Sequence, residues 1–412
     1  MEVLYRCCAG LDVHAKTVVA CLIQDGRKEV RTFSTMTDDL LALSDWLVEA
    51  GCTHVAMEST GVYWKPVFNL LEGLLEVLLV NAQHVKAVPG RKTDVRDCAW
   101  LADLLRHGLL KASFIPPLEI RELRELTRYR QTLVKEQVAV ANRIQRLIES
   151  GNIKLGQVAS DVLGVSGRAM LKALAAGERD AAKLAALAKG SLKHKEAELR
   201  RALHGRLTAA QCFVLGELLA RIDELDQALA RVKDEIIREV EASPNPFVRE
   251  AIELLQTIPG VGLRVAEVIV SEIGVEMSCF PSDGHLASWA GVCPGSHESA
   301  GKRKSGKTTK GNVYVRTALV QAAWAATHTK DTYLAAQYRR LVKHKGKQRA
   351  LVAVGHSILV IIYHVLKHKV SYHELGGGYF DRQNVERQRQ MFIRKLEGLG
   401  LKVTVEELPV AA

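Results

Sequence analysis

The chain has 412 residues, of which 48% are hydrophobic and 25% are charged. These values are ordinary for a soluble globular protein, and the length allows two or three domains with a substantial core. The net charge of +11 favours a polyanionic partner. Nucleic acid fits better than a membrane surface because the basic residues are not gathered on one amphipathic segment, although a merely soluble basic surface would carry the same charge.

The first 115 residues alternate between β-rich and helical patterns. Strands are predicted over residues 6–13, 17–24, 28–34, 53–58 and 76–81, and helices near 38–50, 61–74 and 93–107. Three consecutive strands suggest an antiparallel meander, and the helix–strand alternation after them suggests a mixed sheet. With an acid on the first strand and another on the fourth, this order is typical of the RNase H-like α/β fold.

Four acidic residues occupy the ends of these elements. Asp12 ends the first strand and Glu58 the fourth, while Asp94 and Asp97 stand three residues apart as a helix begins. Carboxylates at strand ends face the crevice where open α/β sheets bind ligands, and an i, i+3 pair lies on one helix face. Such a cluster would repel itself unless divalent cations neutralise it. A single Asp at a strand end is more often a cap or turn former, so the prediction of a metal site depends on all four together.

Pro116-Pro117 ends this region, and residues 116–245 are predicted to be helical. Two segments carry an apolar seam with heptad-like spacing and charged residues between the seam positions. This pattern favours a coiled-coil arm, and the alternative is a pair of helices packed on a globular body. Several short helices are expected over residues 160–205, between the two segments. The seam positions are Leu126, Arg130, Leu133, Gln137, Val140, Ile144 and Leu147, then Val214, Leu218, Ile222, Leu225, Leu229, Val232, Ile236 and Val240.

Residues 246–370 are predicted to form a mainly α-helical domain, followed by a tail over 371–412. Near its start, Pro259-Gly260-Val261-Gly262 separates two apolar helical runs, which is typical of a helix-hairpin-helix motif. Gly260 and Gly262 would let backbone amides approach a phosphate, although a tight helical hairpin can use the same glycines only for packing.

A second chemical centre is predicted in the same domain. Ser299 lies among small residues, and the basic residues Lys302, Arg303, Lys304, Lys307 and Lys310 follow it. A serine there could present its hydroxyl to a phosphodiester, but a free serine is a weak nucleophile that needs activation. Local composition alone favours a solvated loop that only contacts phosphates.

The remaining features indicate an intracellular, soluble protein. The eight cysteines form no CxxC pair and several lie in apolar runs, which indicates buried reduced thiols. The N-terminus lacks the pattern of a signal peptide. The apolar stretch at 351–366 is shorter than the ~20 residues of a membrane span and contains His356 and His364, so a buried helix is expected.

Several ordered sequence blocks resemble the IS-one-ten family of insertion-sequence transposases, which includes bridge-RNA-guided recombinases. The resemblance covers nearly the whole chain, and ordered blocks are more specific than a single motif. The blocks are Gly10 to Lys16, Met57 to Gly61, Gly90 to Ala102, Ile258 to Gly262, Phe280-Pro281 with Leu286 to Gly291, His297 to Gly301, and Lys310-Gly311-Asn312.

The resemblance implies a RuvC-like domain whose Asp-Glu-Asp-Asp tetrad is Asp12, Glu58, Asp94 and Asp97, together with a nucleophilic serine at Ser299. The usual Ser-Ser-Gly is here Glu298-Ser299-Ala300, so the two residues beside Ser299 depart from the family pattern. The central helices resemble the family's dimerising coiled-coil arm.

The activity implied is that of a DNA transposase or recombinase that uses magnesium (or manganese) and forms a covalent phosphoserine–DNA intermediate. The implied partners are donor and target DNA, a noncoding bridge RNA, and further copies of the chain as a dimer assembling to a tetramer, in the bacterial cytoplasm at the nucleoid. Two alternatives stay open. One is a two-metal RuvC-like nuclease or junction resolvase that uses water, and the other is a catalytically silent nucleic-acid-binding scaffold.

Overall fold

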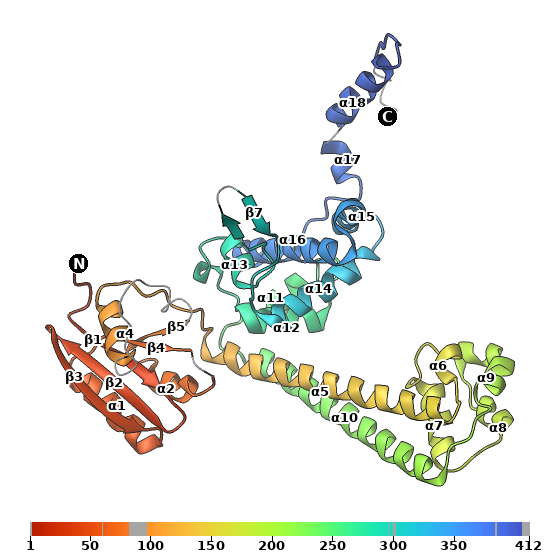
Figure 1. Cartoon of the computed structure of the whole chain (residues 1–412), viewed down its shortest axis with the longest axis horizontal. Helices are drawn as coiled ribbons and strands as arrows, with labels where there is room; N and C mark the ends of the chain where they lie inside the picture. The colour runs from red at the N-terminus through yellow and green to blue at the C-terminus, as the bar shows by residue number, and fades with distance from the viewer. Residues whose placement is uncertain are drawn as a thin grey trace. The chain divides into compact units, whose positions relative to one another are not determined.

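The structure is a computed structural model that describes the main chain of residues 2–59, 61–81, 97–295, 297–299, 302–383 and 385–405 (Figure 1). Side chains are described for the same residues except 297–299, 302–305, 381, 383 and 385–388. The chain divides into two compact units, Met1–Ile115 and Pro116–Ala412.

The first unit contains a five-stranded mixed sheet with the strand order β3-β2-β1-β4-β5. The strands β1 (Cys7–Val13), β2 (Thr17–Gln24) and β3 (Arg27–Ser34) form an antiparallel meander, whereas β4 (His54–Glu58) and β5 (Glu76–Val80) run parallel to β1. Asp25 and Gly26 connect β2 to β3 with φ values of 45° and 88°, as a tight two-residue hairpin requires. The predicted meander and mixed sheet are confirmed.

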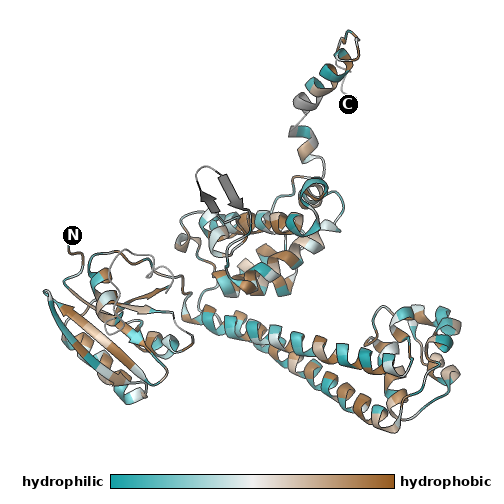
Figure 2. Ribbon diagram, in the orientation of Figure 1, coloured by the Kyte–Doolittle hydropathy of each residue, from teal (hydrophilic) through white to brown (hydrophobic). Residues whose placement is uncertain are grey.

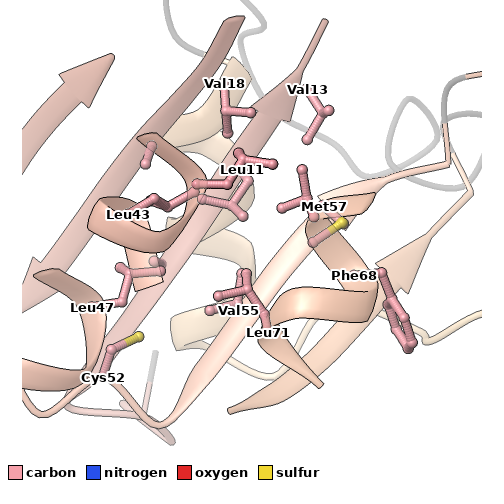
Figure 3. Packing of buried hydrophobic residues seen from close by; sticks show 14 of the residues in the cluster. Leu11, Val13, Val18, Leu43, Leu47, Cys52, Val55, Met57, Phe68 and Leu71 are labelled. Atoms are coloured by element: carbon pink, nitrogen blue, oxygen red, sulfur yellow. The ribbon is translucent and has the colours of Figure 1, made fainter. Parts of the chain in front are cut away.

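Helices cover both faces of this sheet. Helices α1 (Thr37–Glu49) and α2 (Trp64–Leu71) pack on one face through a core that includes Leu11, Leu43 and Met57 (Figure 3). Helix α4 (Asp97–Arg106) packs on the other face, where Cys98, Ala102 and Leu105 meet Cys8, Cys21 and Ala56. Strand alternation explains the two cores, because neighbouring residues of β1 point to opposite faces.

The second unit begins with two long helices, α5 (Leu118–Ser150) and α10 (Ala209–Ala242), that pack along each other in opposite directions. Their pairs fix this direction: Gln137 donates to Asp226 and, closer to the far end, Gln211 donates to Ser150. The chain between these two helices forms the expected short helices. They are α6 (Leu155–Val158), α7 (Val165–Ala175), α8 (Ala181–Ala186), η1 (Gly190–Lys195) and α9 (Glu196–Ala202).

The predicted seam matches the buried stripe in the middle of α5 and along most of α10, and it departs from that stripe at both ends of α5 and at the start of α10. Arg130, Leu133, Val140 and Ile144 are buried in α5, but Thr127 and Ile148 are buried in place of Leu126 and Leu147. In α10, Leu215 and Leu219 are buried, whereas Val214 is 44% exposed. A straight helix repeats every 3.6 residues, so its buried stripe drifts away from a strict 3.5-residue repeat toward either end.

The rest of the unit is mainly helical. It contains α11 (Phe247–Leu255), α12 (Leu263–Ile273), η2 (Met277–Cys279), α13 (Asp283–Trp289), a hairpin of β6 (His297–Ser299) and β7 (Lys302–Ser305), α14 (Val313–Thr327), α15 (Tyr333–Lys345), α16 (Lys347–His368), α17 (Tyr379–Gln383) and α18 (Val385–Glu397). Figure 2 shows α12 as mainly hydrophobic and α5 as mainly hydrophilic.

Helix α16 is the one described helix that is long and apolar enough to cross a membrane. Half of its most apolar window is buried inside the protein, and the helix packs against α11, α13, α14 and α15. It is therefore the central helix of this domain, as the prediction of a buried helix over 351–366 required.

Candidate functional site

Asp12 and Glu58 lie next to each other at the edge of the sheet where the parallel strands β1 and β4 have their carboxyl ends. The parallel pairing of β1 with β4 joins Leu11 to Met57, and Asp12 and Glu58 are the next residues on the two strands. Strand alternation turns both side chains to the face that Cys8 and Ala56 occupy, which is the face covered by α4. Both residues are half-buried.

Asp97 joins this face as the first residue of α4. The helix lies against β1 because Gly10 has no side chain: a Cβ atom there would stand 2.2 Å from the carbonyl oxygen of Cys98. Burial raises the pKa of the Cys98 thiol, and the nearby negative charges of Asp12 and Asp97 raise it further.

The exposed His14 ring extends this acidic edge. Its Nε2 atom lies 3.1 Å from Asp12 Oδ2, and the backbone N–H of His14 donates to Thr17 at the β1–β2 turn. His14 is thus a hydrogen-bonding neighbour of the Asp12 carboxylate.

The donor chemistry at this edge fits a divalent metal, since Asp12, Glu58 and Asp97 offer the carboxylate oxygens that hard cations prefer. No group of three or more His, Cys, Asp or Glu side chains placed to hold a metal ion occurs within the described part of the chain. Asp94, the fourth predicted acid, lies outside the described residues.

Ser299 belongs to the second unit and ends strand β6. It pairs with Lys302 of β7, so the segment predicted as a solvated loop is instead a short β-hairpin. The side chains of Ser299, Lys302, Arg303 and Lys304 are not among those described, whereas Lys307 and Lys310 are exposed after the hairpin.

The base of this hairpin is closed by backbone contacts. Pro294 bridges Thr308, and the N–H of Gly295 donates to the carbonyl of Lys307 over 2.9 Å. Below them, a Cβ atom on Gly291 (φ 71°) would stand 2.6 Å from the nitrogen of Gly311. Gly291 and Gly311 have no side chains, so the segments that enter and leave the hairpin can contact each other through their backbones.

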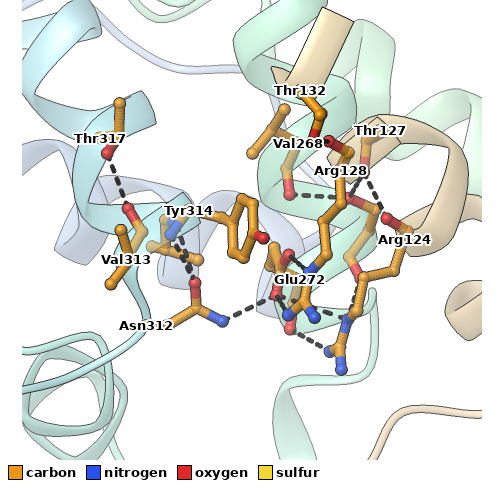
Figure 4. Close-up of polar contacts among 12 residues, drawn as sticks. Arg124, Thr127, Arg128, Thr132, Val268, Glu272, Asn312, Val313, Tyr314 and Thr317 are labelled. Carbon is orange, nitrogen blue, oxygen red and sulfur yellow. Dashed lines mark hydrogen bonds and ion pairs between the residues drawn. The ribbon is translucent and has the colours of Figure 1, made fainter. Parts of the chain in front are cut away.

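A polar network centred on the buried Glu272 joins α5, α12 and the start of α14 (Figure 4). Asn312 caps α14 by accepting from the N–H groups of Tyr314 and Val315, and its amide donates to Glu272 Oε2 over 2.7 Å. Glu272 is fully buried and accepts two hydrogen bonds from Arg128 of α5, at 2.7 and 2.9 Å. One carboxylate of α12 thus joins the base of α5 to the residue that ends the hairpin segment.

A second arginine completes this junction. Arg124 donates to the backbone carbonyls of Ser271 and Glu272, at 3.0 and 2.7 Å. Burial lowers the pKa of the Arg124 guanidinium to about 10, against the opposing effect of the Glu272 charge. It therefore stays charged near neutral pH. The sequence patterns missed this network, although a Glu on the otherwise apolar side of α12 was a signal for it.

The two glycines of the predicted helix-hairpin-helix differ in environment. Gly260 has φ 88° and packs so tightly on α14 that a Cβ atom would stand 2.3 Å from the carbonyl of Ala322. Gly262 is exposed at the N-terminus of α12, and a Cβ atom added to it would have nothing within 4 Å. Gly260 therefore has a packing role, and Gly262 is the glycine whose surroundings leave room for a ligand.

Two family models match the chain. Residues 9–152 match one described as a transposase, of the DEDD type found in IS110 elements, and residues 252–339 match one described as a transposase of the IS116/IS110/IS902 family. The first unit is therefore the RNase H-like domain of a DEDD transposase, a class for which divalent metal use is expected. The chain belongs to the IS110 family of transposases, the IS-one-ten family that its sequence blocks resemble.

Similar proteins span most of the chain. The transposase for insertion sequence element IS1111A of Coxiella burnetii is 24% identical over 88% of this chain and 90% of its own length. The pilin gene-inverting protein of Moraxella bovis is 23% identical over 87% and 95%, respectively. A 43.6 kDa protein of insertion element IS110 from Streptomyces coelicolor is 25% identical over 68% and 72%.

Proposed function

We propose that this transposase cuts and exchanges DNA strands with a composite active site. Asp12, Glu58, Asp94 and Asp97 would hold a divalent metal, magnesium or manganese, and Ser299 would be the nucleophile. The observation that carries the proposal is that Asp12 and Glu58 end adjacent parallel strands on the face of the sheet that is covered by α4, the helix that begins at Asp97.

The chemistry follows from these residue types. When bound, the metal supplies positive charge that polarises the scissile phosphate. The Ser299 hydroxyl attacks phosphorus, a new Oγ–P bond forms, the bond to the leaving deoxyribose oxygen breaks, and that oxygen takes a proton. The phosphoserine bond conserves the energy of the broken phosphodiester. A second DNA end can therefore displace the serine without energy from nucleotide hydrolysis.

Rejoining, in addition to cutting, is supported by the relatives. A protein named for inverting a pilin gene must reconnect the strands that it breaks. The sequence resemblance supports guidance by a noncoding bridge RNA that pairs with donor and target DNA. The protein would then grip nucleic acid mainly by shape and phosphate, which suits its net charge of +11.

The second unit would provide the assembly and DNA-binding surfaces. We assign α5 and α10 to a coiled-coil arm that dimerises, with a tetramer as the active assembly, because their apolar stripes and paired charges are typical of such helices. We assign α11 and α12 to a helix-hairpin-helix motif that contacts DNA at Gly262, beside Lys302, Arg303, Lys304, Lys307 and Lys310 around the hairpin. This assembly would act in the bacterial cytoplasm, at the nucleoid.

Trapping the covalent intermediate tests the serine mechanism. DNA carrying an element end is incubated with protein and magnesium, the reaction is denatured, and protein–DNA adducts are resolved by gel electrophoresis. We expect an adduct that Ser299→Ala abolishes and that the matched variant Ser296→Ala retains, since only one hydroxyl attacks. Cleaved DNA without any adduct would favour the rival nuclease that uses water.

The same assay tests the metal site. Asp94→Asn removes one carboxylate charge with little change in volume, and we expect strand cleavage to fall by at least about 100-fold because cation binding weakens. Full strand transfer by this variant would instead favour the catalytically silent scaffold, with the cleavage chemistry supplied by another protein.

A further inference from the structure

The second unit contains two strongly basic segments. Residues 299–330, which include the hairpin, contain seven Lys and Arg residues and no Asp or Glu. Residues 332–373 contain eight Lys and Arg residues and no Asp or Glu. This second segment comprises α15, α16 and the turn between them.

The cations gather where these two helices meet. Lys343 and Lys345 are exposed at the end of α15, and Arg339 is exposed about one turn before Lys343. Lys347 and Arg349 are exposed at the start of α16. None of the five forms an ion pair with any residue that the structure describes. The flanking acids in the sequence, Asp331 and Glu374, belong to the other end of α15: Glu374 accepts from the N–H of Tyr333, roughly 18 Å along the helix from Lys345.

Several basic residues elsewhere in this unit form ion pairs. Arg168 contacts Asp223 and Asp226, and Lys172 also contacts Asp223. Arg221 of α10 pairs with Glu136 and Glu224. The corner of α15 and α16 differs from these sites in that five cations gather there without an acidic residue among them.

Helix stability does not account for the cluster. Lys343 and Lys345 are favourable at the C-terminus of α15, where the helix dipole is negative. Lys347 and Arg349 stand in the first turn of α16, where the same dipole repels cations and no acidic residue offsets them. An arrangement that costs stability in the free protein indicates that an anionic partner neutralises it.

The corner is held rigidly. Gly346 connects the two helices and has a φ of 75°. Gln337 of α15 donates a hydrogen bond of 2.8 Å to Ser357 of α16. Leu334 and Ala335 of α15 are buried. The guanidinium of Arg340 lies 4.8 Å from the ring centre of Phe380, which ties the outer side of α15 to α17. Because the five cations stand on packed helices, the backbone that carries them is already ordered before they contact successive phosphates.

We propose that Arg339, Lys343, Lys345, Lys347 and Arg349 form a binding surface for the sugar-phosphate backbone of duplex DNA. The residues span roughly 12 Å along the two helix ends, enough for two or three phosphates of one groove. Lysine and arginine contacts to phosphate position a duplex and carry no sequence information. The inference rests on DNA being the substrate of the proposed function, and is independent of the tetrad and of Ser299.

The test is equilibrium binding of the full-length protein, freed of nucleic acid, to a fluorescein-labelled 30-base-pair duplex in a series of NaCl concentrations. The variant is Lys343→Gln/Lys345→Gln/Lys347→Gln. The control is Lys135→Gln/Arg231→Gln/Lys233→Gln, which removes three exposed charges from α5 and α10. Circular dichroism and thermal unfolding establish that both variants fold, and no strand chemistry is needed for the readout.

We expect the corner variant to bind DNA at least about tenfold more weakly at a fixed salt concentration, with the slope of log K against log[salt] reduced in magnitude by about 2 to 3. The control should keep both values near those of the unaltered protein. Equal losses in the two variants would overturn the proposal, since net charge alone would then explain binding. So would unchanged DNA binding, and a loss confined to a labelled RNA hairpin would assign the surface to RNA instead.

Discussion

At the residue scale, Glu272 has the most demanding environment in the second unit. Its side chain is fully buried, and it accepts from Arg128 and Asn312. A buried carboxylate is tolerated only when charge and hydrogen bonds compensate its desolvation. The guanidinium of Arg128 also makes a cation–π contact, since it lies over the ring of Tyr314 at 4.4 Å from the ring centre. Removing Glu272 would leave the half-buried guanidinium of Arg128 and the half-buried amide of Asn312 without their acceptor.

Glu272→Ala is therefore expected to destabilise the second unit by about 3–5 kcal/mol, the usual cost of breaking one side of a buried ion pair. The measurement is the thermal unfolding of the whole chain by calorimetry. The matched control is Glu253→Ala, since Glu253 pairs with Arg249 on the surface, with side chains 62% and 67% exposed. That variant should lose less than about 1 kcal/mol. Equal losses in both variants would mean that the network contributes little.

At the element scale, the placement of α4 on the sheet decides where Asp97 lies. Gly10 of β1 contacts the helix backbone directly, and a Cβ there would stand 2.5 Å from the nitrogen of Ala102 as well as close to Cys98. A side chain at position 10 must therefore push α4 away from β1. Since α4 begins at Asp97, this displacement would separate Asp97 from Asp12.

Gly10→Ala should thus destabilise the first unit by about 1–3 kcal/mol through overpacking and reduce strand cleavage. Gly216→Ala is the contrasting variant, because Gly216 lies inside α10 and a Cβ atom added to it would have nothing within 4 Å. There the same change should raise stability by up to about 1 kcal/mol. Hydrogen exchange in residues 97–106, followed by mass spectrometry, should accelerate only in Gly10→Ala, and unchanged exchange there would contradict the packing argument.

The elements were predictable from sequence to the extent that local pattern determines them. Strand β1 alternates between two cores, and the apolar seam predicted from Leu126 to Leu147 lies within one continuous helix, α5. The β6–β7 hairpin was missed because its strands, His297–Ser299 and Lys302–Ser305, consist of polar and charged residues and show no alternation with apolar ones. The Glu272 network joins residues about 140 positions apart. No local pattern encodes such contacts, so only the carboxylates on adjacent parallel strands could be foreseen as neighbours.

At the scale of the whole molecule, the chemistry of the proposed site is divided between two separately folded units. Asp12, Glu58 and Asp97 belong to Met1–Ile115, whereas Ser299 belongs to Pro116–Ala412. The long helices α5 and α10 would bring a second copy of the chain alongside. Such a dimer can pair the acidic edge of one subunit with the serine of its partner, as the family resemblance suggests.

Mixing two inactive variants tests this arrangement. Asp97→Asn and Ser299→Ala should each fail to form the covalent DNA adduct. If the site is shared, a mixed dimer contains one intact combination, formed by the acids of one subunit and the serine of the other. After random subunit exchange about half of the dimers are mixed, so about one quarter of the adduct yield should return. Mixing Asp97→Asn with the double variant is the control and should restore nothing. An inactive mixture, with subunit exchange verified by differently tagged chains, would place both halves of the site in one subunit.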